Sequence, residues 1–359
     1  MSDETNTAPA TDDAGRPAEG SGQGSGQGSG QGSGQGAGDA AGTAPRGRRG
    51  PRPDRPKRRD VNGWVILDKA VGVTSTQAVA MVKRALNAKK AGHAGTLDPL
   101  ASGILPIALG EGTKTVPFVM DGRKAYLFTV TWGAETDTDD AEGQVVGRSE
   151  ARPTPAEIEA ILPGFIGEIM QVPPRFSAIK IAGERAYDLA RDGEIVELVA
   201  RPVEIDRLSL VAHHGDTSVF EAECGRGTYV RALARDFGRQ LGCLGHVSSL
   251  RRTRVGPFTE EDTVEAEDLE AFRAAVEAGE GPALEDLVLP VQTALGELES
   301  VPVSRDAAAR LMRGQSVILR GRDAPIEGQA FATFGGILVS TGSIERGEFV
   351  PHRVFNLKA

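Results

Sequence analysis

The segment from Gly92 to Gly103 carries the residues of this chain that are best suited to chemistry. It places one carboxylate, Asp98, in a glycine-bounded loop with Pro99 directly behind it. The proline restricts Asp98 to an extended or turn conformation, and the glycines let a ligand approach the backbone closely. A single, stiffly held carboxylate suits nucleophilic catalysis, whereas a metal site needs several converging ligands. The alternative is an ordinary Asp-Pro turn.

The elements around this loop alternate irregularly between strands and helices. Apolar and β-branched runs predict strands over 64–67, 104–109 and 126–132 and a hairpin of 203–212 with 218–224. Capping signals and helical periodicity predict helices after Thr74, from 154 to 162, from 228 to 241 with Gly242 as C-cap, near 267–278 and over 304–312. This pattern favours an α+β fold, with a mixed, largely antiparallel sheet flanked by helices, over a doubly wound one.

The chain divides into three predicted parts. Residues 21–36 are four copies of Ser-Gly-Gln-Gly, which have too little apolar area to offset their conformational entropy. From 46 to 59, seven arginines and Lys57 stand against Asp54 alone, a basic arm that suits a polyanion or simply solubilises the chain. We therefore expect a disordered tail over 1–60, a main domain over 61–295 and a small β-barrel domain over 296–359.

Several functional classes are disfavoured. Cys224 and Cys243 lack metal-ligand spacing, so we expect reduced core cysteines of a cytoplasmic protein. No apolar run reaches the length of a membrane span, and no secretory signal opens the sequence. Segments 109–115, 137–143 and 225–228 resemble phosphate, calcium and dinucleotide loops, but each lacks required residues. We predict no cofactor and no metal.

From Asn62 to the C-terminus, the chain resembles the bacterial tRNA pseudouridine-55 synthase family (TruB). The matching segments, in order, are 63–69 (GWVILDK), 92–103 (GHAGTLDPLASG), 124–126, 133–143, 172–180 (VPPRFSAIK), 185–187, 224–231 (CGRGTYVR) and 246–252. The resemblance implies a pseudouridine-synthase fold with a small PUA-like RNA-binding barrel. It also implies isomerisation of one T-loop uridine of tRNA, in which uracil leaves C1′ and rejoins it through C5.

This resemblance gives three residues catalytic roles. Asp98 matches the family nucleophile, which attacks either the sugar or the base. Arg231 matches its arginine partner, a permanently charged fork. Tyr126 matches the tyrosine that stacks on the target base and can remove the proton at C5. The structural alternative for Arg231 is a surface arginine, and the alternative for Tyr126 is a core aromatic residue on a strand.

Further residues match substrate-binding positions. Tyr229 and Leu250 match pocket walls, and His93 matches the histidine that packs against the opened T-loop, unless it is a surface residue. Asp140 matches a substrate-contacting acid, with a solvated turn as the alternative. We expect the remaining two, Lys69 and Lys180, to contact phosphate or to order the site.

The predicted partner is tRNA, whose target nucleotide must leave its stack to react. We expect a monomer that needs no protein partner and no membrane. A non-catalytic tRNA-binding or tRNA-folding factor could use the same groove. An enzyme directed by a guide RNA is another alternative, whereas a glycosidase would need a second matched acid that the sequence does not supply.

Overall fold

The structure is a computed structural model, and it describes residues 57–177, 180–181, 184–185, 198–279, 287–319, 321 and 325–357. The predicted disordered tail and most of the basic arm lie outside these residues. The end of the arm is described: the Arg59 N–H donates to the Asn87 carbonyl at 2.8 Å, and the Lys89 N–H donates to the Arg59 carbonyl at 3.0 Å. The last arm residues are therefore bound to the edge of the main domain.

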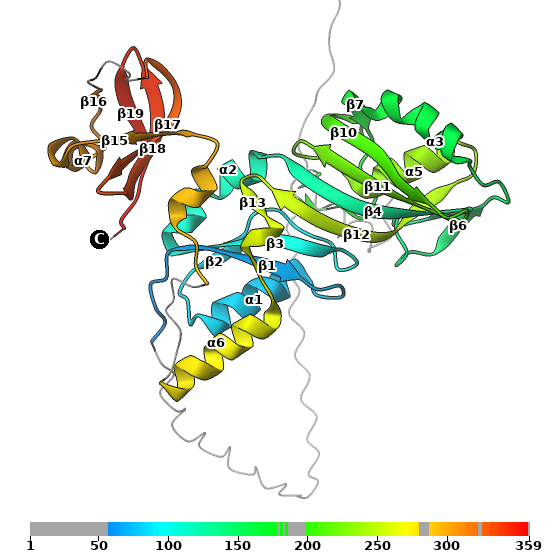
Figure 1. Ribbon diagram of the computed structural model, residues 1–359, viewed down its shortest axis with the longest axis horizontal. Helices are drawn as coiled ribbons and strands as arrows, with labels where there is room; N and C mark the ends of the chain where they lie inside the picture. Colours follow the sequence, from blue (N-terminus) through cyan, green and yellow to red (C-terminus); the bar gives the residue numbers. More distant parts are fainter. Residues whose placement is uncertain are drawn as a thin grey trace, which may run out of the picture. The chain divides into compact units, whose positions relative to one another are not determined.

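A ten-stranded sheet forms the centre of the main domain (Figure 1). Eight strands follow the order β14-β1-β3-β12-β4-β11-β10-β7, while β2 pairs with β3 and β13 with β12. Among the described strands of this sheet, the parallel pairings are β1 with β14 and β3 with β12. The predicted mixed, largely antiparallel sheet is thus confirmed. Its strands are β1 Gly63–Lys69, β2 Ala91–His93, β3 Ser102–Leu109, β4 Lys124–Trp132, β7 Gly167–Gln171, β10 Arg201–His213, β11 Thr217–Cys224, β12 Gly245–Val255, β13 Phe258–Thr259 and β14 Thr263–Val264.

Strand β12 lies between β3 and β4, yet its sequence gave no strand signal. It carries three arginines, and its alternation of apolar and polar residues is broken by two register shifts against β4, between Val247 and Ser249 and between Arg252 and Arg254. Such bulges add a residue and move the following side chains to the other face. The alternation of apolar and polar residues therefore does not predict this strand, which carries Leu250 and Arg252.

Helices cover the sheet in two groups (Figure 1). Helix α1 (Ser75–Ala85) and helix α6 (Ala266–Ala278) pack on β1 and on each other, whereas α3 (Pro155–Ile161) and α5 (Val230–Gln240) pack around β4, β10 and β12. The cap predicted at Thr74 and the capping box predicted at Thr154 are both present, and the cap of α1 at Thr74 also proves to be a capping box. The remaining helical segments of the main domain are α2 Val116–Asp121, η1 Gly110–Lys114, η2 Leu162–Phe165, η3 Glu260–Asp262 and η5 Val291–Leu295.

Aromatic packing joins α5 to the sheet. The ring of Phe220 on β11 lies 5.4 Å from that of Phe128 on β4 and 5.3 Å from that of Phe237 on α5, measured between centroids. All three side chains are buried. Cys224 and Cys243 are buried free thiols in the same core, as predicted.

Helix α5 begins two residues later than its sequence predicts. Tyr229 is extended (φ −109°, ψ 113°), and its N–H donates to Gln171 Oε1 at 2.8 Å instead of entering the helix. Gly242 follows the C-cap with a positive φ of +68°, which a glycine adopts without strain. The first helical turn is thereby attached to the end of β7.

The C-terminal residues form a second, five-stranded sheet of order β15-β17-β18-β19-β16. Among the described residues its two edge strands, β15 and β16, do not pair with each other, so it is an open half-barrel, and helix α7 (Arg305–Leu311) packs on it. This arrangement agrees with the predicted PUA-like domain. Its strands are β15 Glu299–Pro302, β16 Val317–Ile318, β17 Glu327–Phe334, β18 Ile337–Glu345 and β19 Glu348–Val354, and the small pairs elsewhere are β5 Ala134–Thr136 with β6 Val145–Arg148 and β8 Lys180–Ile181 with β9 Glu184–Arg185.

Candidate active site

The backbone on both sides of Asp98 is fixed by hydrogen bonds. Ser75, the first residue of α1, donates its hydroxyl to the Leu97 carbonyl and accepts from the Leu97 N–H, both at 2.9 Å. On the other side, the Pro99 carbonyl accepts from the Gly72 N–H at 2.7 Å. Leu97 is buried, whereas the Asp98 side chain is 37% exposed. The loop therefore presents a rigidly held carboxylate that a substrate can reach.

Arg252 binds the backbone of this loop from strand β12, although the sequence predicted no role for it in the site. Its side chain is buried; Nε donates to the Ile104 carbonyl at 2.8 Å, and the two Nη atoms lie 3.3 and 3.4 Å from the carbonyls of Gly95 and Thr96. Gly103 makes room for it: at φ +97°, a Cβ there would collide with the Arg252 backbone. The segment 251–254 (RRTR) has the composition of a solvated surface, and only the register of β12 shows that Arg252 points inward.

Arg231 joins Asp98 to a second carboxylate. From the first turn of α5, its Nε lies 3.0 Å from Asp98 Oδ2 and its Nη1 lies 3.3 Å from Asp140 Oδ2. The same guanidinium donates to the carbonyls of Thr138 and Phe176 at 2.8 and 2.9 Å. Its side chain is 6% exposed. A planar fork with this many acceptors has little freedom to rotate, so Asp98 meets a fixed positive charge.

Asp140 is buried rather than solvated. Its Oδ1 accepts from the Thr138 hydroxyl at 2.6 Å and from the Glu142 N–H at 3.1 Å, while Oδ2 faces Arg231. Its backbone bridges to Val247 on β12. The predicted substrate-contacting acid thus lies directly behind the Asp98–Arg231 pair.

Tyr126 and Lys69 are two further ionisable residues whose electrostatics are coupled to Asp98. Burial raises the pKa of Tyr126, on β4, to about 12; the positive charge of Arg252 and a hydrogen bond to it oppose this shift, and the negative charge of Asp98 adds to it. Burial lowers the pKa of Lys69 to about 8, against the attraction of Asp98. The Lys69 ammonium is fully buried and donates to the carbonyls of Ala70 and Val73 at 2.9 and 2.8 Å. This placement orders the turn after β1 and keeps the ammonium from a solvent-side phosphate.

The other predicted site residues surround this group less closely. Tyr229 caps α5 beside Arg231; burial raises the pKa of its phenol, and a hydrogen bond to Ser177 opposes that shift. Leu250 is buried on β12 opposite Phe128. His93 lies half-buried on β2, and Lys180 lies on β8, where its side chain falls outside the described part of the structure.

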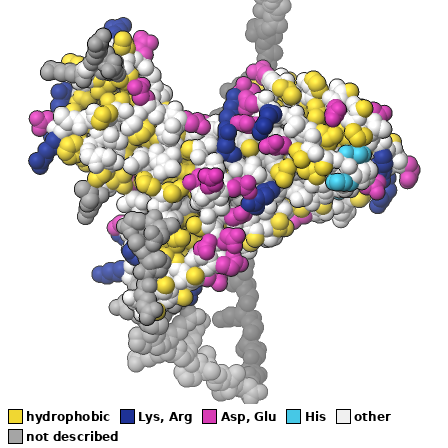
Figure 2. Space-filling view, in the orientation of Figure 1, with side chains coloured by type: hydrophobic (Ala, Val, Ile, Leu, Met, Phe, Trp, Pro, Cys, Tyr) yellow, Lys and Arg dark blue, Asp and Glu magenta, His cyan; other side chains and the backbone are white. Residues whose placement is uncertain are grey.

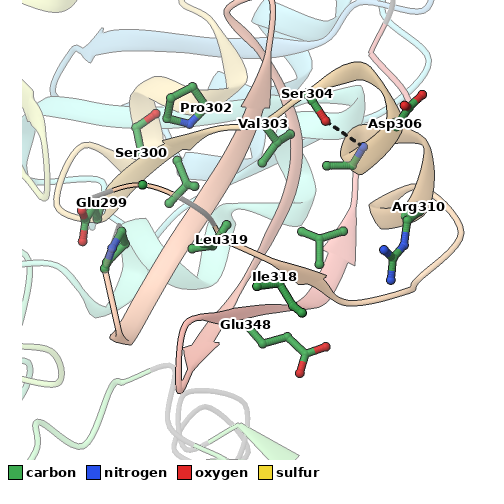
Figure 3. A pocket seen from close by; sticks show the side chains of 15 residues that line it. Glu299, Ser300, Pro302, Val303, Ser304, Asp306, Arg310, Ile318, Leu319 and Glu348 are labelled. Carbon is green, nitrogen blue, oxygen red and sulfur yellow. Dashed lines mark hydrogen bonds between the residues drawn. The ribbon is translucent and has the colours of Figure 1, made fainter. Parts of the chain in front are cut away.

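Neither of two large cavities in the described part of the chain is lined by Asp98. A cavity of about 790 Å³ lies in the C-terminal sheet, between β15, β16 and α7 (Figure 3). A second, of about 510 Å³, lies beside the 135–139 segment and α5. The face drawn in Figure 2 intersperses basic and acidic side chains. Within the described residues, no three His, Cys, Asp or Glu side chains group as metal ligands, and no helix has the length and apolarity to cross a membrane.

Two family models match the chain. The model of the TruB family pseudouridylate synthase N-terminal domain matches residues 83–230, and that of the tRNA pseudouridylate synthase B C-terminal domain matches 231–296. Among curated proteins, tRNA pseudouridine synthase B of Rhodopseudomonas palustris is 61% identical over 316 residues, covering 88% of this chain and 86% of the relative. The Bradyrhizobium diazoefficiens protein of the same name is 63% identical over 302 residues, covering 84% and 87%.

The chain belongs to the TruB family. The solved structures agree with this fold: a chain of a Cbf5-Nop10-Gar1 complex superposes with a TM-score of 0.62 at 26% identity, covering 82% of this chain and 84% of that one. An archaeal box H/ACA Nop10-Cbf5 complex gives the same TM-score and identity, with 82% and 86% covered. The boundary between the two TruB models, at 230/231, falls inside α5, so it separates sequence regions rather than folded domains.

Proposed function

We propose that this TruB-family protein isomerises a uridine of tRNA, at position 55 in the T-loop, to pseudouridine. The observation that carries the proposal is the 3.0 Å pair between Arg231 Nε and Asp98 Oδ2, in which the arginine is buried and the carboxylate is reachable. A nucleophilic carboxylate needs a fixed positive neighbour and an open path to the substrate, and this pair offers both.

The proposed reaction needs only protein groups. Asp98 attacks C1′ or the pyrimidine ring, the C1′–N1 bond breaks, and the uracil turns so that C5 bonds to C1′. The bond to Asp98 breaks in the course of this rearrangement and returns the free carboxylate. The proton on C5 then leaves, and N1 gains a proton, so that product and substrate are isomers. Tyr126 is the proposed acceptor of the C5 proton. Because its pKa is about 12, it must first give up its own proton, and the nearby charge of Arg252 favours that step.

Substrate recognition is proposed for the walls of the same site. Tyr229, Leu250 and His93 would contact the extruded nucleotide and the opened loop, with Asp140 acting beside Arg231. Stacking on an aromatic ring such as that of Tyr126 recovers about 1–3 kcal/mol per base, which offsets part of the cost of unstacking. Lys180 is proposed to meet phosphate, whereas the burial of Lys69 supports an ordering role.

We further propose a catalytic domain over 61–295, a PUA-like RNA-binding domain over 296–359, and a monomer that acts alone in the cytoplasm. Purified protein with an unmodified T-arm transcript tests this, with mapping of the modified nucleotide. We expect pseudouridine at position 55 without any added protein or guide RNA. Product formed only with a guide RNA and partner proteins would favour the guided alternative.

Asp98→Asn is the decisive variant. It removes the nucleophilic charge at constant size, so we expect no measurable product while tRNA affinity stays within about threefold. If the wild-type protein binds tRNA and refolds it without forming pseudouridine, the non-catalytic factor is the correct function.

A further inference from the structure

Three arginines on one face of α5 each pair with a carboxylate of the same short segment. Arg231, Arg235 and Arg239 are spaced by four residues, so they point in one direction from successive helical turns. Their partners run in the opposite order along 135–140: Asp140 at 3.3 Å, Asp139 at 3.0 Å and Glu135 at 2.7 Å. The first pair belongs to the site described above, and the other two have no assigned role.

The middle pair is buried as deeply as the first. The side chains of Arg235 and Asp139 are 7% and 8% exposed. Asp139 has a positive φ of +62°, a conformation that few residues other than glycine adopt, and it is held by its N–H to the Thr136 carbonyl and by its carbonyl to the Val247 N–H. The turn therefore directs the Asp139 carboxylate inward, toward α5.

Arg235 also contacts the second segment that Arg231 holds. Its Nη2 donates to the Val172 carbonyl at 2.8 Å, four residues before the Phe176 carbonyl that accepts from Arg231. The two arginines, one helical turn apart, thus bind the same two segments of chain, 138–140 and 172–176. Any shift of these stretches at Arg235 would be transmitted to the acceptors of Arg231.

We propose that Arg235 and Asp139 are positioning residues for pseudouridine formation, which fix these two stretches so that Arg231 holds Asp98 in its reactive orientation. This inference rests on the proposed function. A buried ion pair is often no more stabilising than a well-packed apolar pair, so stability alone does not explain its presence. A guanidinium that bonds a carboxylate and a carbonyl at once fixes the distance between two segments, which an apolar contact does not.

Protonation of Asp139 offers an independent readout. Burial raises its pKa to about 6, opposed by Arg235, Arg231 and Arg239 and assisted by Glu135. Asp236, which accepts from Arg235 Nε at 2.8 Å, and Asp140 also face this group. The carboxylate is ionised at neutral pH and becomes neutral in mild acid, where the pair would weaken.

The test compares Asp139→Asn with Glu135→Gln. Both change a carboxylate to an amide, in ion pairs with successive arginines of α5. Arg239, the partner of Glu135, is 56% exposed and, among the described residues, donates no hydrogen bond to 172–176, so Glu135→Gln serves as a matched control. We expect Asp139→Asn to lower the single-turnover rate constant at least tenfold, with the Kd for a T-arm transcript within twofold. Glu135→Gln should change neither. The wild-type rate should fall below pH 6, and that fall should be absent from the residual rate of Asp139→Asn.

Two further variants distinguish a loss of positioning from a loss of folding. Arg235→Lys keeps the buried charge but reaches one partner at a time, so we expect a folded protein with an intermediate rate. Asp139→Asn combined with Arg235→Met removes both charges, and we expect wild-type melting with a reduced rate. A folded double variant with the wild-type rate, or equal rates for Asp139→Asn and Glu135→Gln, overturns the inference. Absence of product from the wild-type protein would instead reject the proposed function.

Discussion

Asp98 owes its geometry to hydrogen bonds on the backbone around it as much as to Arg231. The backbone at Leu97 and Pro99 is bonded to α1 and to the preceding turn, and Arg252 holds the carbonyls of Gly95 and Thr96. The sequence predicted the stiff Asp-Pro loop because glycine and proline restrict or free the backbone locally. It could not predict Arg252, because that interaction depends on contacts across about 150 residues of chain.

Substitutions of Tyr126 can test its role in removing the C5 proton separately from its role in stacking on the uracil. Tyr126→Phe keeps the ring and removes the hydroxyl, so we expect turnover to fall by about 10²–10⁴-fold with little change in tRNA affinity. Tyr126→Leu also removes the ring, and it should weaken binding by a further 1–3 kcal/mol or so. Single-turnover rates and filter-binding affinities distinguish the two effects. Full activity of the phenylalanine variant would remove Tyr126 from the proton transfer.

Lys69 gives a pH dependence of stability with a definite sign. The folded chain releases this proton near pH 8, whereas an ordinary lysine, as in the unfolded chain, holds it to about 10.5. Between these values the unfolded state binds more protons, so this group makes the unfolding free energy rise with pH. We expect the wild-type protein to gain stability relative to Lys69→Met between pH 7.5 and 10. Urea unfolding across that range measures the difference, and a constant difference would contradict the shifted pKa.

At the scale of elements, the site depends on how closely β3 and β12 approach. Arg252 pairs with Gly103 in a parallel register, and the glycine lies at φ +97°. Capping boxes and the 203–224 hairpin could be predicted because their signals are local. The placement of β12 could not, since its bulges and its inward arginine contradict the alternation expected of a strand.

Gly103→Ala should therefore damage both stability and activity. The new methyl group would collide with the Arg252 backbone at a φ that alanine rarely adopts, so we expect a loss of about 2–4 kcal/mol in unfolding free energy. Gly215→Ala is the control, because Gly215 also has a positive φ, +71°, but has open space around it. Thermal melting compares them; equal losses would show that backbone strain alone, without the close approach, determines the effect.

At the scale of the whole molecule, the second sheet is hydrogen-bonded to η1, the short helix that follows β3. Lys114 Nζ donates to the Val354 carbonyl at 2.9 Å and lies 5.5 Å from the centre of the Phe355 ring, while the Asn356 N–H donates to Glu111 at 2.7 Å. Residues on both sides of the proposed 295/296 boundary share one apolar cluster. Short β segments with regularly spaced glycines predict a second domain in this region, but these contacts depend on folded positions that such a local pattern does not encode.

The basic arm allows a prediction about salt. We expect deletion of residues 1–56 to leave turnover on T-arm RNA unchanged and to reduce the slope of log Kd against log salt by as much as 3 or so, because each phosphate contact contributes about 0.7–0.9. Residues 57–59 are kept because their backbone is bonded to Asn87 and Lys89. A full-length variant with Arg46, Arg48, Arg49, Arg52 and Arg55 changed to Gln separates charge from length. An unchanged slope in both would leave the arm a solubilising tail.

The two buried thiols have a practical consequence. Burial raises the pKa of Cys224 to about 11 and also raises that of Cys243, so neither presents a thiolate to an alkylating reagent while the core is closed. Labelling by a maleimide would then follow the opening of the core around β11 and α5. The unmodified protein thus contains its own unfolding sensor, and an exposed cysteine introduced elsewhere could carry a single fluorophore.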